Sequence, residues 1–270
     1  MIPSELVHYT TKETALEHIL YEKQIKFGLL GMTNDPKETK EWGFPLLIPM
    51  EESLINKNNV SNNINFSIAV QEIVNEVMMK EWKVLCLTKH STSNHKQTLS
   101  KEFSEAYSHP GLWAHYGENH SGVCIVFNQK KLDENIHNHL TNDFKIFQGS
   151  VDYNNLKAIV HYPIDVSNTR INIKDAIREY FINNYKDCFL RKTIDWKSEH
   201  EYRWLIHDKK NDPIYIPTIG AIKGVIVGPD FPKVYETTLA ILCKEMKIYA
   251  GKIHWYSGMP RVNKSAIYSP

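Results

Sequence analysis

Two short apolar runs, residues 84–88 and 122–127, constrain the fold more than any other feature of this sequence. Each has the length of a β-strand and is rich in β-branched side chains, and neither alternates polar with apolar residues. Strands of this kind are covered on both faces of a sheet. We therefore expect both runs to lie near the centre of a sheet.

Other segments add both strands and helices. Further strands are expected at 5–10, 25–30, 201–207, 213–217, 222–228 and 252–256. Helices are expected directly after Thr10, which has capping-box spacing to Glu13, and over 66–77, 173–191 and 232–246. With no repeat or linker rich in Pro, Gly or Ser, this predicts one α+β domain over 1–270, on a mixed central sheet, continuous or split, flanked by helices.

Polar segments and charge restrict the protein class. Residues 51–65 are polar and rich in Asn, which predicts a flexible surface insertion.

The 32 basic residues nearly balance 31 acidic ones, so no overall electrostatic field attracts nucleic acid or an anionic membrane. The four cysteines lack C-x-x-C spacing, and no apolar run approaches the roughly 20 residues of a membrane span. We expect a cytoplasmic protein without a membrane partner.

The chain lacks the common enzyme signatures. It contains no G-x-G-x-x-G, no P-loop, no H-E-x-x-H and no G-x-S-x-G sequence. Its paired histidines lack the neighbouring Cys or carboxylate ligands of a zinc site, so no metal is expected.

A charged stretch interrupts the apolar segment near residue 200. On a strand, Glu199, Glu201 and Arg203 share one face, while Tyr202 and Trp204 share the other. Unpaired charges cannot be buried in hydrocarbon, so the first face is either a solvated surface with a cross-strand ion pair or the wall of a cleft. The bulky apolar residues between the charges favour a central strand, and hence the cleft.

Two other segments supply candidate ligand contacts. His8 and Thr10 lie on one side of the first expected strand, as partly buried structural groups or as site residues. Trp113, His115 and Tyr116 lie in a Gly-bounded segment, where aromatic rings either stack on a ligand or close the end of the sheet.

Four motifs in a fixed order resemble the bacterial domain of unknown function 2971. The resemblance spans residues 7–228. Its motifs are the segments 8–10, 34–36 and 112–116, followed by Trp196, Glu199, Glu201, Tyr202 and Arg203. This resemblance implies a family but no reaction.

A further resemblance is to the ADP-ribosyltransferase superfamily, including its DarT-type enzymes. It implies that His8 and Thr10 position the NAD ribose, that Tyr116 or Trp113 stacks on nicotinamide, and that Glu201 completes an ADP-ribosyltransferase-like site. His8, Tyr116 and Glu201 are the expected catalytic residues. The expected NAD contacts are His8, Tyr9, Thr10, Asn34, Asp35, Trp113, His115, Tyr116, Lys192, Glu199 and Arg203.

The resemblance predicts an NAD-dependent ADP-ribosyltransferase or NAD glycohydrolase, acting as a bacterial effector, toxin or phage-defence protein. A fixed carboxylate would stabilise the oxocarbenium-like ribose, and Arg203 or Lys192 would pair with a phosphate, or Arg203 would orient Glu201. A nucleic acid or a protein would accept the transferred group, and a partner protein would neutralise the effector.

Two alternatives stay open at this point. One is a non-catalytic nucleotide- or nucleic-acid-binding module, in which His8, Trp113 and Tyr116 form a base-stacking pocket. The other is a metal-dependent nuclease, whose expected residues are Asp35, Glu199, Glu201 and His8.

Overall fold

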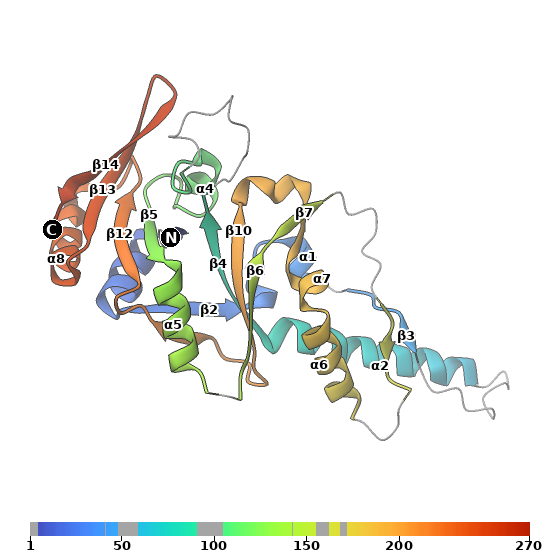
Figure 1. Ribbon diagram of the computed structural model, residues 1–270. Coiled ribbons are helices and arrows are strands. Elements are labelled where there is room, and N and C mark those ends of the chain that lie inside the picture. The colour runs from blue at the N-terminus through green and yellow to red at the C-terminus, as the bar shows by residue number, and fades with distance from the viewer. Residues whose placement is uncertain are drawn as a thin grey trace.

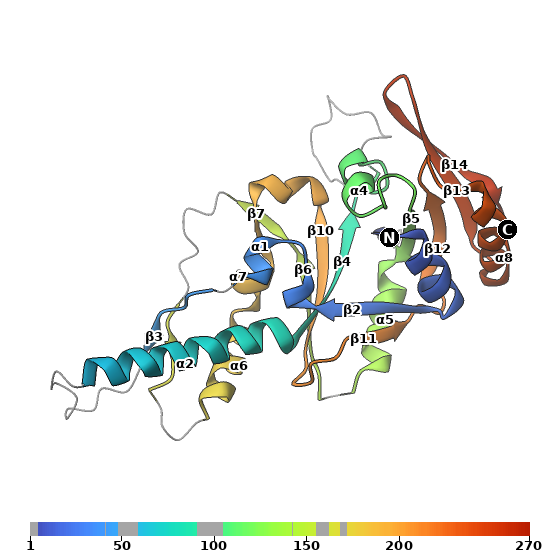
Figure 2. The ribbon, with the colours of Figure 1, turned by 180° about the vertical axis from the view of Figure 1, so that it is seen from behind.

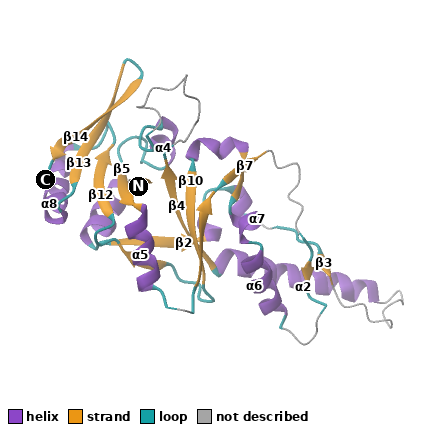
Figure 3. Cartoon of the chain, in the orientation of Figure 1, coloured by secondary structure: helices purple, strands orange, loops and turns teal. Residues whose placement is uncertain are grey.

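A computed structural model describes residues 5–40, 42–47, 59–90, 105–141, 143–154, 162–167 and 172–270. One ten-stranded sheet forms the centre of the protein, and helices flank it (Figures 1 and 3). Most neighbouring strands are antiparallel, whereas β12 and β13 are parallel. The predicted α+β fold with a mixed central sheet is therefore confirmed.

The main sheet contains β1 (Glu5–Thr10), β2 (Gln24–Leu29), β4 (Trp82–Lys89), β5 (Val123–Asn128), β6 (Lys145–Ser150), β10 (Glu201–His207), β11 (Ile214–Pro217), β12 (Ile222–Val227), β13 (Tyr249–Tyr256) and β14 (Met259–Tyr268). Two small parallel pairs join β3 (Leu46–Leu47) to β8 (Ile164–Asp165) and β7 (Asp152–Asn154) to β9 (Arg191–Thr193).

The α-helices are α1 (Pro36–Thr39), α2 (Asn59–Lys80), α4 (Pro110–His115), α5 (Gln129–His139), α6 (Ile173–Asn183), α7 (Tyr185–Phe189) and α8 (Glu236–Met246). A π-helix, η1 (Thr14–Tyr21), follows β1, and the 3-10 helices are η2 (Leu30–Met32), η4 (Ile194–Glu199) and η5 (Lys233–Tyr235). Among the described residues, no helix has both the length and the apolar character needed to cross a bilayer.

The central sheet splits beside β4. One edge of β4 pairs with β10 along its whole length, and the other edge is shared by β1 and β2. There β2 pairs with residues 83–84 and β1 with residues 88–89, so 85–87 have no strand partner on that edge in the described registers. Figure 2 shows β2 running crosswise to β4. Because β1 pairs with β5 along all six of its residues, it separates from β4 after Val7.

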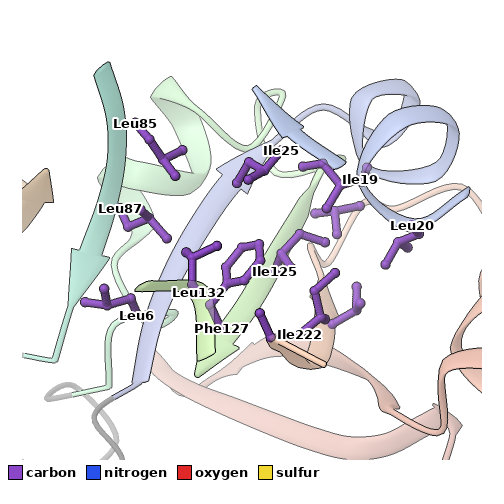
Figure 4. Packing of buried hydrophobic residues seen from close by; sticks show 14 of the residues in the cluster. Leu6, Ile19, Leu20, Ile25, Leu85, Leu87, Ile125, Phe127, Leu132 and Ile222 are labelled. Carbon is purple, nitrogen blue, oxygen red and sulfur yellow. The ribbon is translucent and has the colours of Figure 1, made fainter. Parts of the chain in front are cut away.

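Apolar side chains cover the faces of this split sheet. The largest cluster contains Leu6 of β1, Leu85 and Leu87 of β4, and Phe127 of β5, packed against η1 and α5 (Figure 4). A second cluster packs α2, α6 and α7 against the opposite side of β4 and β10, and a third surrounds Trp113 beside β1. Burial of these side chains is the main favourable term that holds the diverging strands in place.

Several expected elements differ at their ends. The helix expected over 173–191 is interrupted at Asn184, where the carbonyl of Tyr180 accepts both the backbone N–H and the side-chain amide of Asn184. Helix α2 begins at Asn59, before the expected start at residue 66, so the second half of the insertion predicted at 51–65 is helical, and 51–58 lie outside the described residues. The hydroxyl of Thr11, rather than Thr10, accepts the N–H of Thr14.

The junction between β1 and β5 provides a stability test. A Cβ atom at Gly122 would lie 2.4 Å from the carbonyl oxygen of Thr10, whereas a Cβ at Gly28 meets nothing within 4 Å. We expect Gly122→Ala to lower the free energy of unfolding by about 1–3 kcal/mol through this steric conflict, and Gly28→Ala to leave it unchanged or slightly raised. Urea denaturation measures both, and equal stabilities would contradict the packing described for this junction.

Candidate active site

A cavity of about 410 Å³ lies where β1 separates from β4. This volume falls within the range of roughly 300–1,000 Å³ that is common for small-molecule sites. The residues that line it come from β1, β4, β9, β10 and the segments around α1, α4 and η4. They are Val7, His8, Tyr9, Thr33, Asn34, Glu38, Cys86, Leu87, Thr88, Leu112, His115, Tyr116, Lys192, Glu199, Glu201 and Arg203.

His8 bridges the split in the sheet. Its Nδ1 atom lies 3.1 Å from the carbonyl oxygen of Cys86, in the part of β4 that lacks a strand partner on this edge. A carbonyl only accepts hydrogen bonds, so Nδ1 carries the proton in this contact. Burial lowers the pKa of His8, although the bond to Cys86 opposes this, and the ring is therefore neutral at pH 7. In this tautomer Nε2 is a hydrogen-bond acceptor.

Arg203 is the centre of a buried ionic network. Its Nε and one terminal nitrogen donate to the two carboxylate oxygens of Glu201, at 2.7 and 3.1 Å. The other terminal nitrogen donates to Glu38 Oε1 and, at 2.8 Å, to the carbonyl of Phe189. Glu201 and Arg203 are 4 % and 1 % exposed, so the alternative of a solvated strand face is wrong. These charges are instead buried as a paired set.

Lys192 continues the network from Glu201 to Glu199. Its Nζ lies 2.8 Å from Glu199 Oε2 and 2.9 Å from Glu201 Oε2. The charges therefore alternate from Glu199 through Lys192, Glu201 and Arg203 to Glu38. Three carboxylates and two cations give the set a formal net charge of −1. Burial alone would raise the pKa of Glu201, but the adjacent Arg203 and Lys192 lower it to about 2.

The backbone conformation that brings Glu199 into this network is not indicated by the sequence pattern. Glu199 is the last residue of η4 and not part of β10, so the expectation of one continuous strand face is wrong at this position. His200, between the two acids, has a left-handed conformation with φ of 45°. This turn of the backbone lets both Glu199 and Glu201 face Lys192.

Tyr116 is held at the cavity wall by two polar contacts. Its hydroxyl donates to Glu199 and accepts a hydrogen bond of 2.8 Å from the side-chain amide of Asn34. Burial, followed by the bond to Glu199, raises the pKa of Tyr116, so the phenol stays protonated. The segment before α1 and the end of α4 are thereby joined across the cavity.

Most of the residues predicted from the sequence meet in this cavity. Those that line it are His8, Tyr9, Asn34, His115, Tyr116, Lys192, Glu199, Glu201 and Arg203. Three others do not line it. Thr10 is buried at the end of β1, and the carbonyl of Asp35 accepts backbone N–H groups at the start of α1. Trp113 is fully buried against Tyr9, so the hypothesis that it stacks on a ligand is wrong.

The predicted phosphate contacts also need correction. Arg203 and Lys192 already pair with carboxylates and are almost completely buried, which leaves neither as an open phosphate ligand. The other role expected for Arg203, the orientation of Glu201, matches its two bonds to that carboxylate.

Glu38 and the backbone carbonyl of Cys86 are the two polar contacts of the site that the sequence pattern does not predict. Glu38 follows the Asn34-Asp-Pro36 motif closely, and its spacing of three residues from Asp35 is the only local signal. The backbone carbonyl of Cys86 is the second group, and a backbone acceptor leaves no signal in the residue type.

The acidic and histidine side chains of the site do not form a metal-binding group among the described residues. In the described ranges, no group of three or more His, Cys, Asp or Glu side chains could hold a metal ion. Asp35, Glu199, Glu201 and His8, which the nuclease hypothesis requires, are all described and form no such group.

Comparison with known proteins finds a similarity in the middle of the chain. Residues 112–204 match the family described as Protein of unknown function (DUF2971). The predicted resemblance to this family is thus confirmed over these residues. The match includes Tyr116, Lys192, Glu199, Glu201 and Arg203 of the cavity, whereas the motifs at 8–10 and 34–36 precede it. Neither a curated protein nor a solved structure matches the chain significantly.

The low pKa of Glu201 predicts a dependence of stability on pH. A carboxyl group with a pKa of about 2 in the folded state, against an ordinary 4.5, stabilises the fold above pH 4.5, and this contribution is lost as the pH falls toward 2. We expect Glu201→Gln to flatten the acid side of the stability profile measured by urea denaturation. The exposed Glu17 offers a control, because Glu17→Gln should retain the wild-type profile. Identical profiles for all three proteins would contradict the pairing.

Removal of the central cation should destabilise the protein strongly. Arg203→Met leaves Glu201 and Glu38 buried without their main partner, and we expect a loss of about 3–5 kcal/mol in the free energy of unfolding. Adding Glu201→Gln and Glu38→Gln to this variant should restore part of the loss. The exposed Arg261 serves as control, because Arg261→Met should change stability by less than about 0.5 kcal/mol. Comparable effects at both arginines would argue against a buried network.

Proposed function

We propose that this protein cleaves the bond between nicotinamide and ribose in NAD, as an ADP-ribosyltransferase or an NAD glycohydrolase. The observation that carries the proposal is the convergence of His8, Tyr116 and Glu201 on one cavity. These residues are far apart in the sequence, and the sequence alone predicts each of them in such a site. The separation of β1 from β4 supplies the space between them.

The charge of the cavity suits this reaction. When the bond from the ribose C1′ to the nicotinamide nitrogen breaks, the electron pair moves to the ring and neutralises it, while positive charge develops on the ribose. A preorganised site of net charge −1 stabilises that cation more than the ground state. The leaving group needs no proton, so the site requires no general acid for this step.

The two acids of the site have different hydrogen-bonding capacity. Among the described residues, Glu201 is contacted by two nitrogens of Arg203, by Lys192 and by the thiol of Cys86, whereas Glu199 is bonded by Tyr116 and Lys192. A carboxylate has about four acceptor positions, so those of Glu201 are filled and Glu199 retains capacity for a ribose hydroxyl. We assign Glu201 the electrostatic role beside C1′, and Glu199 a hydrogen bond to the ribose.

His8 and Tyr116 would fix the orientation of the substrate. Nε2 of the neutral His8 can accept a hydrogen bond from a substrate hydroxyl. The Tyr116 ring is held in one position by hydrogen bonds to Glu199 and Asn34. Such orientation contributes to rate because the reacting atoms are already aligned. Attack by water at C1′ gives hydrolysis. Attack by an oxygen or nitrogen of a nucleic acid or protein, which then loses its proton, gives transfer.

One feature of the site favours a second candidate function. The cations beside Glu201 offset its charge and limit the stabilisation that it offers to a cationic ribose. A non-catalytic nucleotide-binding module would use the same cavity without this requirement. It predicts a rise in melting temperature with nucleotide concentration but no turnover.

Release of nicotinamide from NAD tests the proposed activity. We expect the wild-type protein to release nicotinamide, measured by liquid chromatography, and Glu201→Gln to lower the rate by about 100-fold or more, because the carboxylate charge is lost where the cation develops. Glu81, a buried carboxylate bonded by two nitrogens of Arg178 outside the cavity, offers a matched control.

Glu81→Gln should weaken folding without stopping turnover, and both variants are assayed at a temperature where they remain folded. Undiminished turnover in Glu201→Gln would remove this residue from the mechanism. Ligand-dependent stabilisation without any turnover in the wild-type protein would favour the binding module.

A further inference from the structure

Glu38 occupies an unusual position at the end of the ionic network. It lies on α1 and lines the cavity, and it is only 3 % exposed. One of its carboxylate oxygens, Oε1, accepts a hydrogen bond from Arg203. The other, Oε2, is buried and has no hydrogen-bond partner among the described residues. A buried acceptor of this kind is costly unless something donates to it.

The other carboxylates of the network do not share this feature. Each oxygen of Glu201 and Glu199 has a donor within the network. Glu38 and Glu199 are the two ends of the set, and each contacts one of the two cations. Glu199 also accepts a hydrogen bond from Tyr116, whereas in the described part of the chain Arg203 is the only side chain that donates to Glu38. This end of the cavity is suited to a donor group and unsuited to an anion.

We propose that Glu38 Oε2 accepts a hydrogen bond from an N–H group of the ligand, and so selects an amide over a carboxylate. The inference rests on the proposed function, in which the ligand is a nicotinamide nucleotide. The carboxamide is then the only N–H donor of the nicotinamide riboside half. A nicotinic acid ring would place a second carboxylate against Glu38, where like charges repel.

The strength of the selection follows from the type of bond. A hydrogen bond to a charged acceptor, compared with repulsion between two carboxylates, predicts a preference of tenfold to a hundredfold for the amide. Glu38→Gln keeps an oxygen for Arg203 and replaces the free acceptor by an NH₂ donor. This variant should bind the carboxylate form about as well as the amide form.

The test compares NAD with its nicotinic acid analogue, and free nicotinamide with free nicotinate. Calorimetry gives the dissociation constants of the two free bases, and initial rates of cleavage give the preference between NAD and its analogue, for wild type, Glu38→Gln and the control Glu81→Gln. Thermal shift confirms that each variant is folded. We expect the wild type and Glu81→Gln to prefer the amide ligands by at least tenfold, and the ratio for Glu38→Gln to fall toward one. An unchanged ratio in Glu38→Gln would overturn the assignment.

The free bases separate the two proposals. Amide-selective binding that depends on Glu38, without cleavage of NAD, would leave the Glu38 assignment standing and overturn the proposed reaction. Cleavage of NAD with no preference between amide and carboxylate ligands would support the proposed reaction and overturn the Glu38 assignment. If Glu38→Gln does not fold, the wild-type ratio decides, because equal or tighter binding of the carboxylate ligands contradicts the inference. Binding of no ligand would overturn both.

Discussion

The pairing of Arg203 with Glu201 is the interaction on which the rest of the site depends. The guanidinium also bonds Glu38 of α1 and the carbonyl that ends α7, so one side chain of β10 joins the nearby α7 to α1, which lies 165 residues away in the sequence. A planar group with several donors in fixed directions can do this, whereas a lysine at the same position could not. The network fixes the side chains of the cavity before any ligand enters.

Space for the cavity comes from the strand pairing. Strand β1 pairs with β5 along its whole length and with β4 only at residues 88–89, while β2 pairs with β4 at residues 83–84. Residues 85–87 of β4 are therefore unpaired on the edge that β1 and β2 share. His8 satisfies one backbone carbonyl in this gap. The split in the sheet therefore creates both the space and the polar groups that face it, while the apolar clusters prevent the strands from closing.

The sequence predicted the central elements of this architecture. The apolar runs became β4 and β5, on either side of β1, and the alternation of Tyr202, Trp204 and Ile206 with Glu201 and Arg203 correctly indicated the two faces of β10. These predictions succeeded because strand periodicity and burial are local properties. Nine of the expected site residues also line the cavity, and most of them belong to the ordered motifs of the sequence.

The remaining features depend on tertiary contacts. Trp113 has an aromatic side chain suited to stacking, but its contact with Tyr9 comes from a different segment and buries it completely. The left-handed backbone at His200 is only weakly indicated by a histidine, so the strand periodicity places Glu199 on a strand that in fact begins at Glu201. The role of Glu38 arises only because α1 packs against β10, which no pattern within either segment specifies.

An experimental structure with bound NAD, or with an analogue that resists cleavage, tests the central claim most directly. The account predicts that the nicotinamide ribose occupies the space between His8, Tyr116 and the acids of β10 and η4, with Arg203 still bonded to Glu201. A nucleotide bound elsewhere on the protein would contradict it, as would a cavity filled by rearranged side chains.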